Sequence, residues 1–152
     1  MPEPFVEDIQ LARHIKVLYD RGVTEVQVLA VDCDGTLTKA NEYPNLGEFR
    51  EGALDALRLF QRAGGKVLLW TCRQGRPLAE ALDAMDAKGF VPDWVNSPTI
   101  ITQSYKPYYD LLIDDRALGC PLDWGFIGRL LTAMAPKDRN WFKRWKAEGG
   151  SA

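Results

Sequence analysis

Short apolar runs alternate along this chain with longer segments whose apolar residues recur at helical spacing, and this alternation leaves few folds open. The runs Val26 to Val31 (VQVLAV) and Lys66 to Trp70 (KVLLW) are almost unbroken, as is typical of strands covered on both faces. Further strands are expected at 90–95 and 109–113. Strands that alternate with helices predict right-handed βαβ crossovers, and therefore an α/β fold with a parallel sheet and helices on both faces.

The helical segments have recognisable starts and stops. Four helices are expected: one over 4–21 that Gly22 ends, one from Ala53 to Gly64, one that has Pro77 at its first position and stops at Gly89, and one that Asp123 caps and Pro136 ends.

The chain is expected to form a single domain over 1–152, with the N-terminal helix, a core over 26–135 and a basic-aromatic tail over 137–152. A net charge of −2 gives no general reason to expect a polyanionic partner. No apolar run approaches the roughly 18–20 residues that span a bilayer, and the acidic segment Met1 to Asp8 lacks the basic and apolar regions expected of a signal peptide. Three cysteines without a framework spacing favour reduced thiols. We therefore expect a cytoplasmic protein with no membrane contact.

Polar residues follow three of the expected strands directly: Asp32, Thr71, and the pair Asp114-Asp115. In open parallel sheets, ligands bind beyond the carboxyl ends of the strands. We therefore expect these side chains to share one site.

The segment Asp32-Cys33-Asp34-Gly35-Thr36 carries the strongest chemical signal. Two carboxylates two residues apart, directly after a buried strand, repel each other unless a cation lies between them. Together with Asp114 and Asp115 they form the hard-oxygen set that Mg²⁺ prefers. Gly35 allows a sharp turn whose N–H groups can point at an anion. The predicted metal residues are Asp32, Asp34, Asp114 and Asp115.

Two further side chains suit a phosphate. The hydroxyl of Thr71 can donate a hydrogen bond to it, and Lys106 can neutralise charge on both Asp32 and a phosphoryl group. Taken singly, each of these residues is more often a turn residue or a solvated side chain. The prediction of a phosphate site depends on the set as a whole.

Four segments, LAVDCDGTL, LLWT, Lys106 and LLIDD, occur in this order and resemble the motifs of the haloacid dehalogenase (HAD) superfamily of phosphohydrolases. The resemblance covers roughly Val26 to Met134. The segments YPNLGE (43–48), WTCRQG (70–75) and IDDRALGCPLDWG (113–125) are similar to small cap-less members, and phage polynucleotide kinase-phosphatases share a similar D-x-D-G-T-L. This resemblance implies a Rossmann-like three-layer α/β/α sandwich with a parallel sheet and no cap domain.

The resemblance also implies a mechanism. Asp32 would attack phosphorus to form an aspartyl-phosphate, and Asp34 would protonate the leaving oxygen and then activate water. Mg²⁺ would be held by Asp32, by the backbone carbonyl of Asp34 and by the acidic pair, with Asp115 bound directly and Asp114 through water. The expected catalytic residues are Asp32, Asp34, Thr71 and Lys106, and the expected substrate-binding residues are Gly35, Cys72 and Arg73.

The intervals between Asp34, Thr71 and Lys106 are each filled by one helix and its strands, so no cap domain fits. The site should then be open, or closed by a second copy of the chain in a homo-oligomer. The segment Leu37 to Phe49, here called the flap, is the expected substrate sensor through Tyr43 and Glu48.

Several residues have weaker assignments. Arg73 is expected either to bind the substrate phosphate or to form a surface salt bridge, and Arg116 to pair with the acids before it. Cys33 and Cys72 are expected to be buried as small apolar side chains, and His14 to lie on the surface. The tail could contact single-stranded nucleic acid, although a helix that packs its aromatic residues on the domain is favoured.

Four functions remain open. The first is a phosphatase of small phosphomonoesters such as sugar phosphates or nucleotides, and the second is a polynucleotide-end (3′-phosphate) phosphatase. The third is a phospho-accepting receiver, which Asp34 disfavours because a second acid would hydrolyse the phosphoaspartate. A catalytically silent interaction module is the fourth.

Overall fold

The computed structural model describes residues 5–97, 104–117 and 122–136. The elements, in chain order, are α1 (Phe5–Asp20), β1 (Val28–Val31), α2 (Ala53–Arg62), β2 (Lys66–Leu69), α3 (Gly75–Ala87), β3 (Trp94–Val95), β4 (Leu111–Ile113) and α4 (Trp124–Met134). The strands form one four-stranded sheet in the order β3-β2-β1-β4. All pairings are parallel, and Val31 lies opposite Leu69 on one side and Ile113 on the other. The carboxyl ends of β1, β2 and β4 are therefore level.

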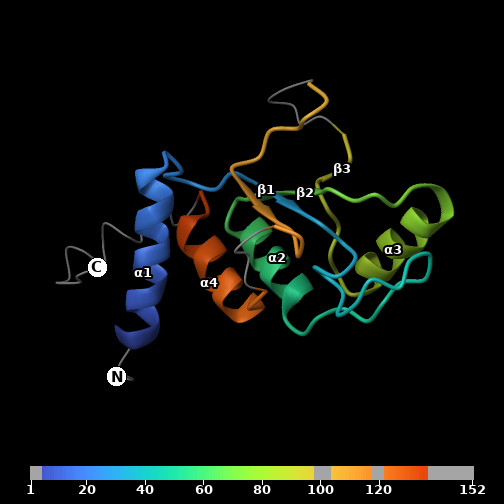
Figure 1. The fold of residues 1–152 in the computed structure, drawn as a ribbon, viewed down its shortest axis with the longest axis horizontal. Helices are drawn as coiled ribbons and strands as arrows, with labels where there is room; N and C mark the ends of the chain where they lie inside the picture. The colour runs from blue at the N-terminus through green and yellow to red at the C-terminus, as the bar shows by residue number, and fades with distance from the viewer. Residues whose placement is uncertain (1–4, 98–103, 118–121, 137–152) are drawn as a thin grey trace.

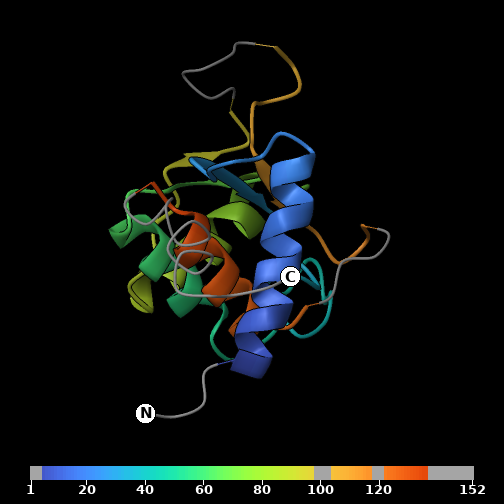
Figure 2. The same ribbon diagram turned by 90° about the vertical axis from the view of Figure 1, so that its left-hand side faces the viewer.

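The sheet is buried on both faces, as a Rossmann-like three-layer α/β/α sandwich requires. Leu29 and Val31 belong to the main core with residues of α2 and α4, whereas Val28 and Ala30 alternate with them and are also fully buried. Helices α2, α3 and α4 lie below the sheet in Figure 1 and α1 stands beside α4, whereas the described part of the segment before β4 lies above the sheet, as Figure 2 also shows. The predicted α/β fold with a parallel sheet is confirmed.

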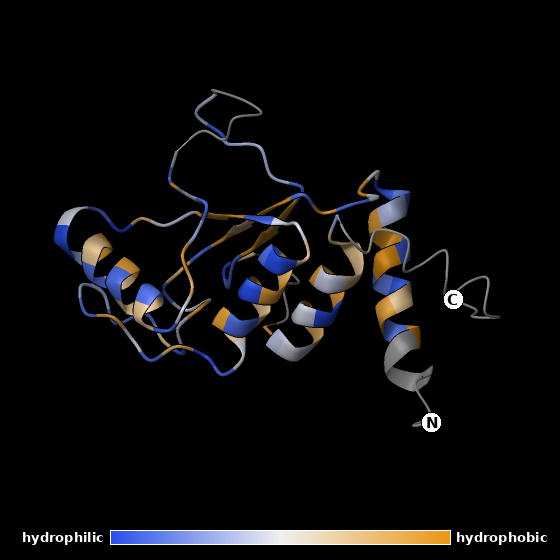
Figure 3. Ribbon diagram, turned by 180° about the vertical axis from the view of Figure 1, so that it is seen from behind, coloured by the Kyte–Doolittle hydropathy of each residue, from blue (hydrophilic) through white to orange (hydrophobic). Residues whose placement is uncertain are grey.

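Helices α2 and α4 pack side by side because small residues meet between them. A Cβ atom added to Gly128 of α4 would lie 3.3 Å from the Cβ of Ala56 in α2, so the two backbones approach closely. The buried residues of α2 recur at helical spacing and form one stripe: Ala53, Leu54, Ala56, Leu57 and Phe60. Figure 3 shows the strands mostly in orange, whereas the helices carry both orange and blue residues, as amphipathic helices do.

The observed elements differ from the expected ones mainly at their ends. Strand β1 begins at Val28 rather than Val26, because the Val26 N–H bonds to Met134 of α4 instead of to a strand. Helix α3 begins at Gly75, so Pro77 is its third residue rather than its first. Both positions lie in the first turn, where a missing N–H costs no helical bond. Asp123 caps α4 as predicted, its carboxylate accepting from Phe126 N at 3.0 Å.

Among the described residues no additional domain separates the strands, and none of the described helices combines the length and apolar character needed to cross a membrane. The predicted tail over 137–152 lies outside the described residues.

Candidate active site

The sheet order brings the acidic residues together. Asp32 directly follows β1, Asp114 and Asp115 directly follow β4, and these two strands are neighbours. The Asp32 N–H extends the ladder by donating to the Ile113 carbonyl at 3.0 Å. One carboxylate oxygen from each of the three aspartates lies within 4.8 Å of the others. The predicted convergence of these three residues is confirmed.

Thr36 holds this acidic cluster in place. Its Oγ1 lies 2.9 Å from Asp32 Oδ2 and 3.1 Å from Asp115 Oδ1, and it accepts from the Asp115 N–H at 2.9 Å. Trp124 of α4 donates its indole N–H to the Thr36 carbonyl at 3.2 Å. Thr36 is fully buried. Sequence reasoning missed this role, although Thr36 stands within the D-x-D-G-T segment that signalled the site.

The electrostatics of Asp32 fit a site that holds a cation. The pKa of the Asp32 carboxyl is raised to about 6, chiefly by burial; the nearby carboxylates of Asp114 and Asp115 also raise it, whereas a hydrogen bond from Thr36 lowers it. Both the burial and the like charges oppose ionisation, and a divalent cation relieves both.

The donor set itself suits Mg²⁺. Three carboxylates from two adjacent strand ends supply the hard oxygen ligands that Mg²⁺ prefers, and water or a phosphate oxygen would complete its coordination. Asp114 and Asp115 each place one carboxylate oxygen within 4.8 Å of Asp32 and of each other, so this distance does not distinguish between them. The predicted distinction between a direct and a water-mediated ligand therefore stays a prediction.

Asp34 is directed differently from the other acids. Its carboxylate pairs with Arg73, which donates from Nε to Oδ2 at 2.8 Å and from Nη2 to Oδ1 at 2.6 Å. The Arg73 side chain is only 1% exposed. The surface salt bridge considered for Arg73 is therefore wrong, since the pair is buried. A ligand role for the Asp34 backbone carbonyl stays a prediction.

A hollow of about 440 Å³ opens over these residues. It is lined by Asp32, Asp34, Asn41, Tyr43, Cys72, Arg73, Asp114 and Arg116. The flap forms one wall of the hollow through Asn41 and Tyr43. Two hydrogen bonds join the ends of the flap into a hairpin, from Lys39 N to the Glu48 carbonyl and from Arg50 N to the Leu37 carbonyl. Tyr43 lies at the flap with 57% of its surface exposed. The hollow is large enough for a phosphorylated small molecule.

Two expectations about residues near this hollow are wrong. Cys72 is exposed rather than buried, because the chain leaves the sheet after β2 and turns toward solvent before α3. Arg116 forms no ion pair with Asp114 or Asp115. Only its backbone N–H contacts the pair, donating to Asp114 Oδ1 at 2.9 Å. Cys33 is buried as predicted, and burial raises the pKa of its thiol to about 12. His14 is exposed, as predicted.

Thr71 is held by a residue that the sequence did not single out. Asn96, just after β3, accepts from the Thr71 N–H at 2.8 Å and donates to the Thr71 carbonyl at 2.7 Å. It does so with a φ of 51°, which asparagine tolerates better than most residues. A second hollow joins Asn96 and Thr71 to Asp32 and Asp114. The only available signal was an asparagine at a strand end.

Lys106 does not join the cluster. It is exposed, its Nζ lies 5.5 Å from the centre of the Tyr109 ring, and it lines neither hollow beside Asp32. Lys106 precedes β4 in the chain. Asp110, just before β4, accepts hydrogen bonds from the N–H groups of Gln27 and Val28 at the start of β1. The chain that follows Lys106 therefore reaches the sheet at the start of these strands, whereas the acidic cluster lies at their ends. A catalytic role for Lys106 stays a prediction.

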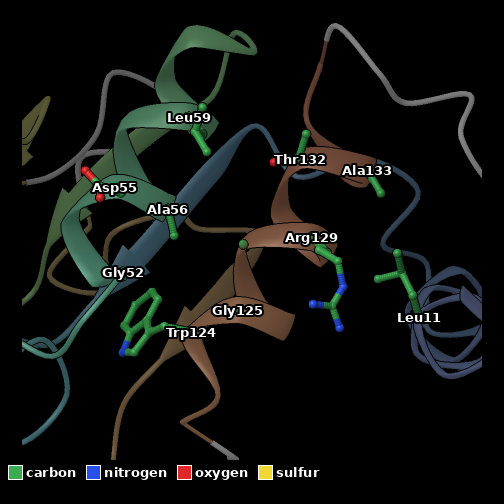
Figure 4. A pocket seen from close by; sticks show the side chains of 11 residues that line it. Leu11, Gly52, Asp55, Ala56, Leu59, Trp124, Gly125, Arg129, Thr132 and Ala133 are labelled. Atoms are coloured by element: carbon green, nitrogen blue, oxygen red, sulfur yellow. The ribbon is translucent and has the colours of Figure 1, made fainter. Parts of the chain in front are cut away.

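A separate groove of about 500 Å³ runs between α2 and α4, away from the carboxylates (Figure 4). Its labelled residues include Leu59, Trp124, Arg129 and Thr132, and Asp55 is the only acid among them. A groove with one carboxylate offers no comparable set of metal ligands, so the candidate active site is the hollow over Asp32.

The fold and the site together define a Rossmann-like α/β protein with an acidic cluster at the carboxyl ends of adjacent parallel strands. No protein-family model and no curated protein matches the chain. Among solved structures it is similar to a conserved protein from Bacteroides thetaiotaomicron, with 34% sequence identity and a TM-score of 0.63 over 70% of this chain and 89% of that one. The chain belongs to the same family as this conserved protein.

Proposed function

We propose that the chain is a Mg²⁺-dependent phosphomonoesterase of the HAD type, which acts through an aspartyl-phosphate on Asp32. The observation that carries the proposal is the convergence of Asp32, Asp114 and Asp115 within 4.8 Å beneath an open hollow, with Asp34 two residues after Asp32. Bound Mg²⁺ would neutralise the carboxylates and the phosphate so that the two can approach.

The residues of the chain divide the remaining work. Asp32 Oδ1 is the oxygen left for attack, because Thr36 contacts Oδ2. The new bond joins this oxygen to phosphorus, and the bond from phosphorus to the leaving oxygen breaks in line with it. Asp34 must enter this step protonated; it would give its proton to the leaving oxygen, and as the carboxylate it would then take one from the water that releases inorganic phosphate from Asp32. Thr71, held by Asn96, faces the second hollow and can donate to a phosphoryl oxygen.

The hollow favours a small substrate over a polymer end. Its volume of about 440 Å³ matches a ligand of metabolite size, and the exposed ring of Tyr43 offers a flat surface to a sugar or a base. We therefore propose a sugar phosphate or a nucleotide as the substrate class.

The proposal is tested by following the hydrolysis of p-nitrophenyl phosphate with Mg²⁺ and with excess chelator. We expect turnover that requires Mg²⁺, and acid-quenched protein that carries one phosphoryl group on the peptide containing Asp32. Undiminished turnover in chelator would refute the metal assignment, and absence of turnover on a broad panel of phosphomonoesters would refute the phosphatase. A stable phosphoaspartate without turnover would instead identify a receiver.

A further inference from the structure

The guanidinium of Arg73 has no donor left for a substrate. Beyond its two bonds to Asp34, Nη1 donates to the Pro44 and Pro77 carbonyls at 3.2 Å each, and Nη2 donates to the Asn45 carbonyl at 2.7 Å. An arginine side chain has five N–H donors. All five are used within the protein, so a phosphate could bind Arg73 only by displacing one of these partners.

These acceptors belong to three different parts of the site. Pro44 and Asn45 lie in the flap, Pro77 lies in the first turn of α3, and Asp34 follows β1. The flap residue Tyr43 also places its ring 5.4 Å from the guanidinium carbon. One buried side chain therefore joins the flap and α3 to the acid beside the nucleophile.

The bonds to Asp34 involve both of its carboxylate oxygens, so Arg73 fixes the rotation of this carboxylate as well as its position. We infer that Arg73 is a positioning residue that anchors the flap and orients Asp34 toward the leaving oxygen, and that Arg116 is the arginine that meets the substrate anion. The orientation of Asp34 matters for catalysis only if the proposed function holds, whereas the anchoring of the flap does not depend on it.

Arg116 has the freedom that Arg73 lacks. It is exposed, it lines the same hollow as Asp32 and Asp114, and its side chain forms no ion pair with either neighbouring aspartate. A guanidinium at the rim of an acidic hollow can pair with a phosphate in two parallel hydrogen bonds.

The roles proposed for Arg73 and Arg116 predict different kinetic effects, on kcat for Arg73 and on KM for Arg116. For Arg73→Lys we expect a loss of kcat that is about tenfold larger with phenyl phosphate, a poor leaving group, than with p-nitrophenyl phosphate, because a misplaced Asp34 protonates the leaving oxygen less well. Inhibition by inorganic phosphate should change by no more than about twofold. For Arg116→Ala we expect KM and the phosphate inhibition constant to rise about tenfold, equally for both substrates.

Arg76→Lys is the matched control, because Arg76 lies three residues after Arg73 on α3 with 89% of its side chain exposed. It should leave all these constants unchanged. If Arg73→Lys instead weakens phosphate inhibition about tenfold and slows both substrates equally, Arg73 binds the substrate and the inference is wrong.

Amide hydrogen exchange of residues 41–46 tests the anchoring without any activity. We expect faster exchange in Arg73→Lys and unchanged exchange in Arg116→Ala and Arg76→Lys. Because a buried lysine could unfold the site, the double variant Asp34→Leu/Arg73→Met removes both charges and leaves none unpaired, and its flap should also exchange faster. Unchanged flap exchange in folded variants would overturn the inference. Absence of phosphatase activity in the unaltered chain, with faster flap exchange in the variants, would refute only the proposed function.

Discussion

The carboxylate of Asp115 lies directly against the bare Cα of Gly35. A Cβ atom at Gly35 would come within 2.6 Å of Asp115 Oδ2 and 3.2 Å of its carboxyl carbon, and the residue has a φ of +80°. The Gly35 carbonyl also accepts from Arg50 Nη2 at 2.9 Å. The acidic cluster can form only because no side chain occupies this position.

Gly35→Ala should therefore abolish Mg²⁺ binding, measured by titration calorimetry, because Asp115 must move away from Asp32. Gly52→Ala is a closely matched control, since Gly52 has a φ of +79° but no atom within 4 Å of an added Cβ. Both variants should lose about 1 kcal/mol of unfolding free energy to backbone strain. Retained Mg²⁺ affinity in Gly35→Ala would show that the close contact is not needed.

The stability of the metal-free protein should depend on Asp32. Its pKa of about 6 in the folded state lies above its ordinary value, so the folded state binds the proton more tightly than the unfolded chain does. This contribution is complete below about pH 4 and is lost as the pH rises through about 6. In chelator at pH 7, Asp32→Asn should raise the unfolding free energy by about 1–3 kcal/mol, and Mg²⁺ should stabilise the unaltered protein more than the variant.

Urea denaturation between pH 4 and pH 8 measures this effect. Asp83→Asn, at an exposed position of α3, removes the same charge away from the cluster and serves as the control. If Asp32→Asn and the unaltered chain show parallel pH profiles in chelator, burial and like charges do not act on Asp32 as described.

The two acids of the first motif should separate in single-turnover experiments. Asp32→Asn should form no phosphoenzyme with any substrate, because no nucleophilic carboxylate remains. Asp34→Asn should still form phosphoenzyme from p-nitrophenyl phosphate, whose leaving group needs little protonation, and should release phosphate from it slowly. Phosphoenzyme in the Asp32→Asn variant would assign the nucleophile to another residue.

Asn96 should control the position of Thr71. Asn96→Gly removes both hydrogen bonds to Thr71 but tolerates the φ of 51°; each bond contributes about 0.5–1.5 kcal/mol. We expect kcat/KM to fall about tenfold in this variant. Asn96→Ala should show the same kinetic loss with a further fall in stability of about 1 kcal/mol, because alanine disfavours a positive φ. Equal stability of the two variants would mean that the backbone relaxes when the amide is lost.

Much of the fold could be predicted from local patterns. The unbroken run before Asp32 forms β1, and the stripe from Ala53 to Phe60 forms the buried face of α2. Burial of apolar residues on one face of an element sets their spacing in sequence, so the spacing predicts the element. The ends of the strands and helices were predicted less well. Val26 is apolar like its neighbours, but its N–H donates to the carbonyl of Met134, which is far away in the sequence, and so Val26 is not part of β1.

By itself, the sequence determined the alternation of strands and helices and the presence of acids at the strand ends, since both follow from residue type and order. Only the tertiary structure decided which of those side chains meet. Asp32 joins Asp114 and Asp115 because β1 and β4 are neighbours, and Asp34 turns to Arg73, 39 residues away. Arg73 and Arg116 each lie three residues after an expected strand end, yet one is buried with every donor used and the other is exposed. Hydrogen bonds between segments that are distant in the sequence cause this difference in burial, and such bonds cannot be predicted from a local sequence pattern.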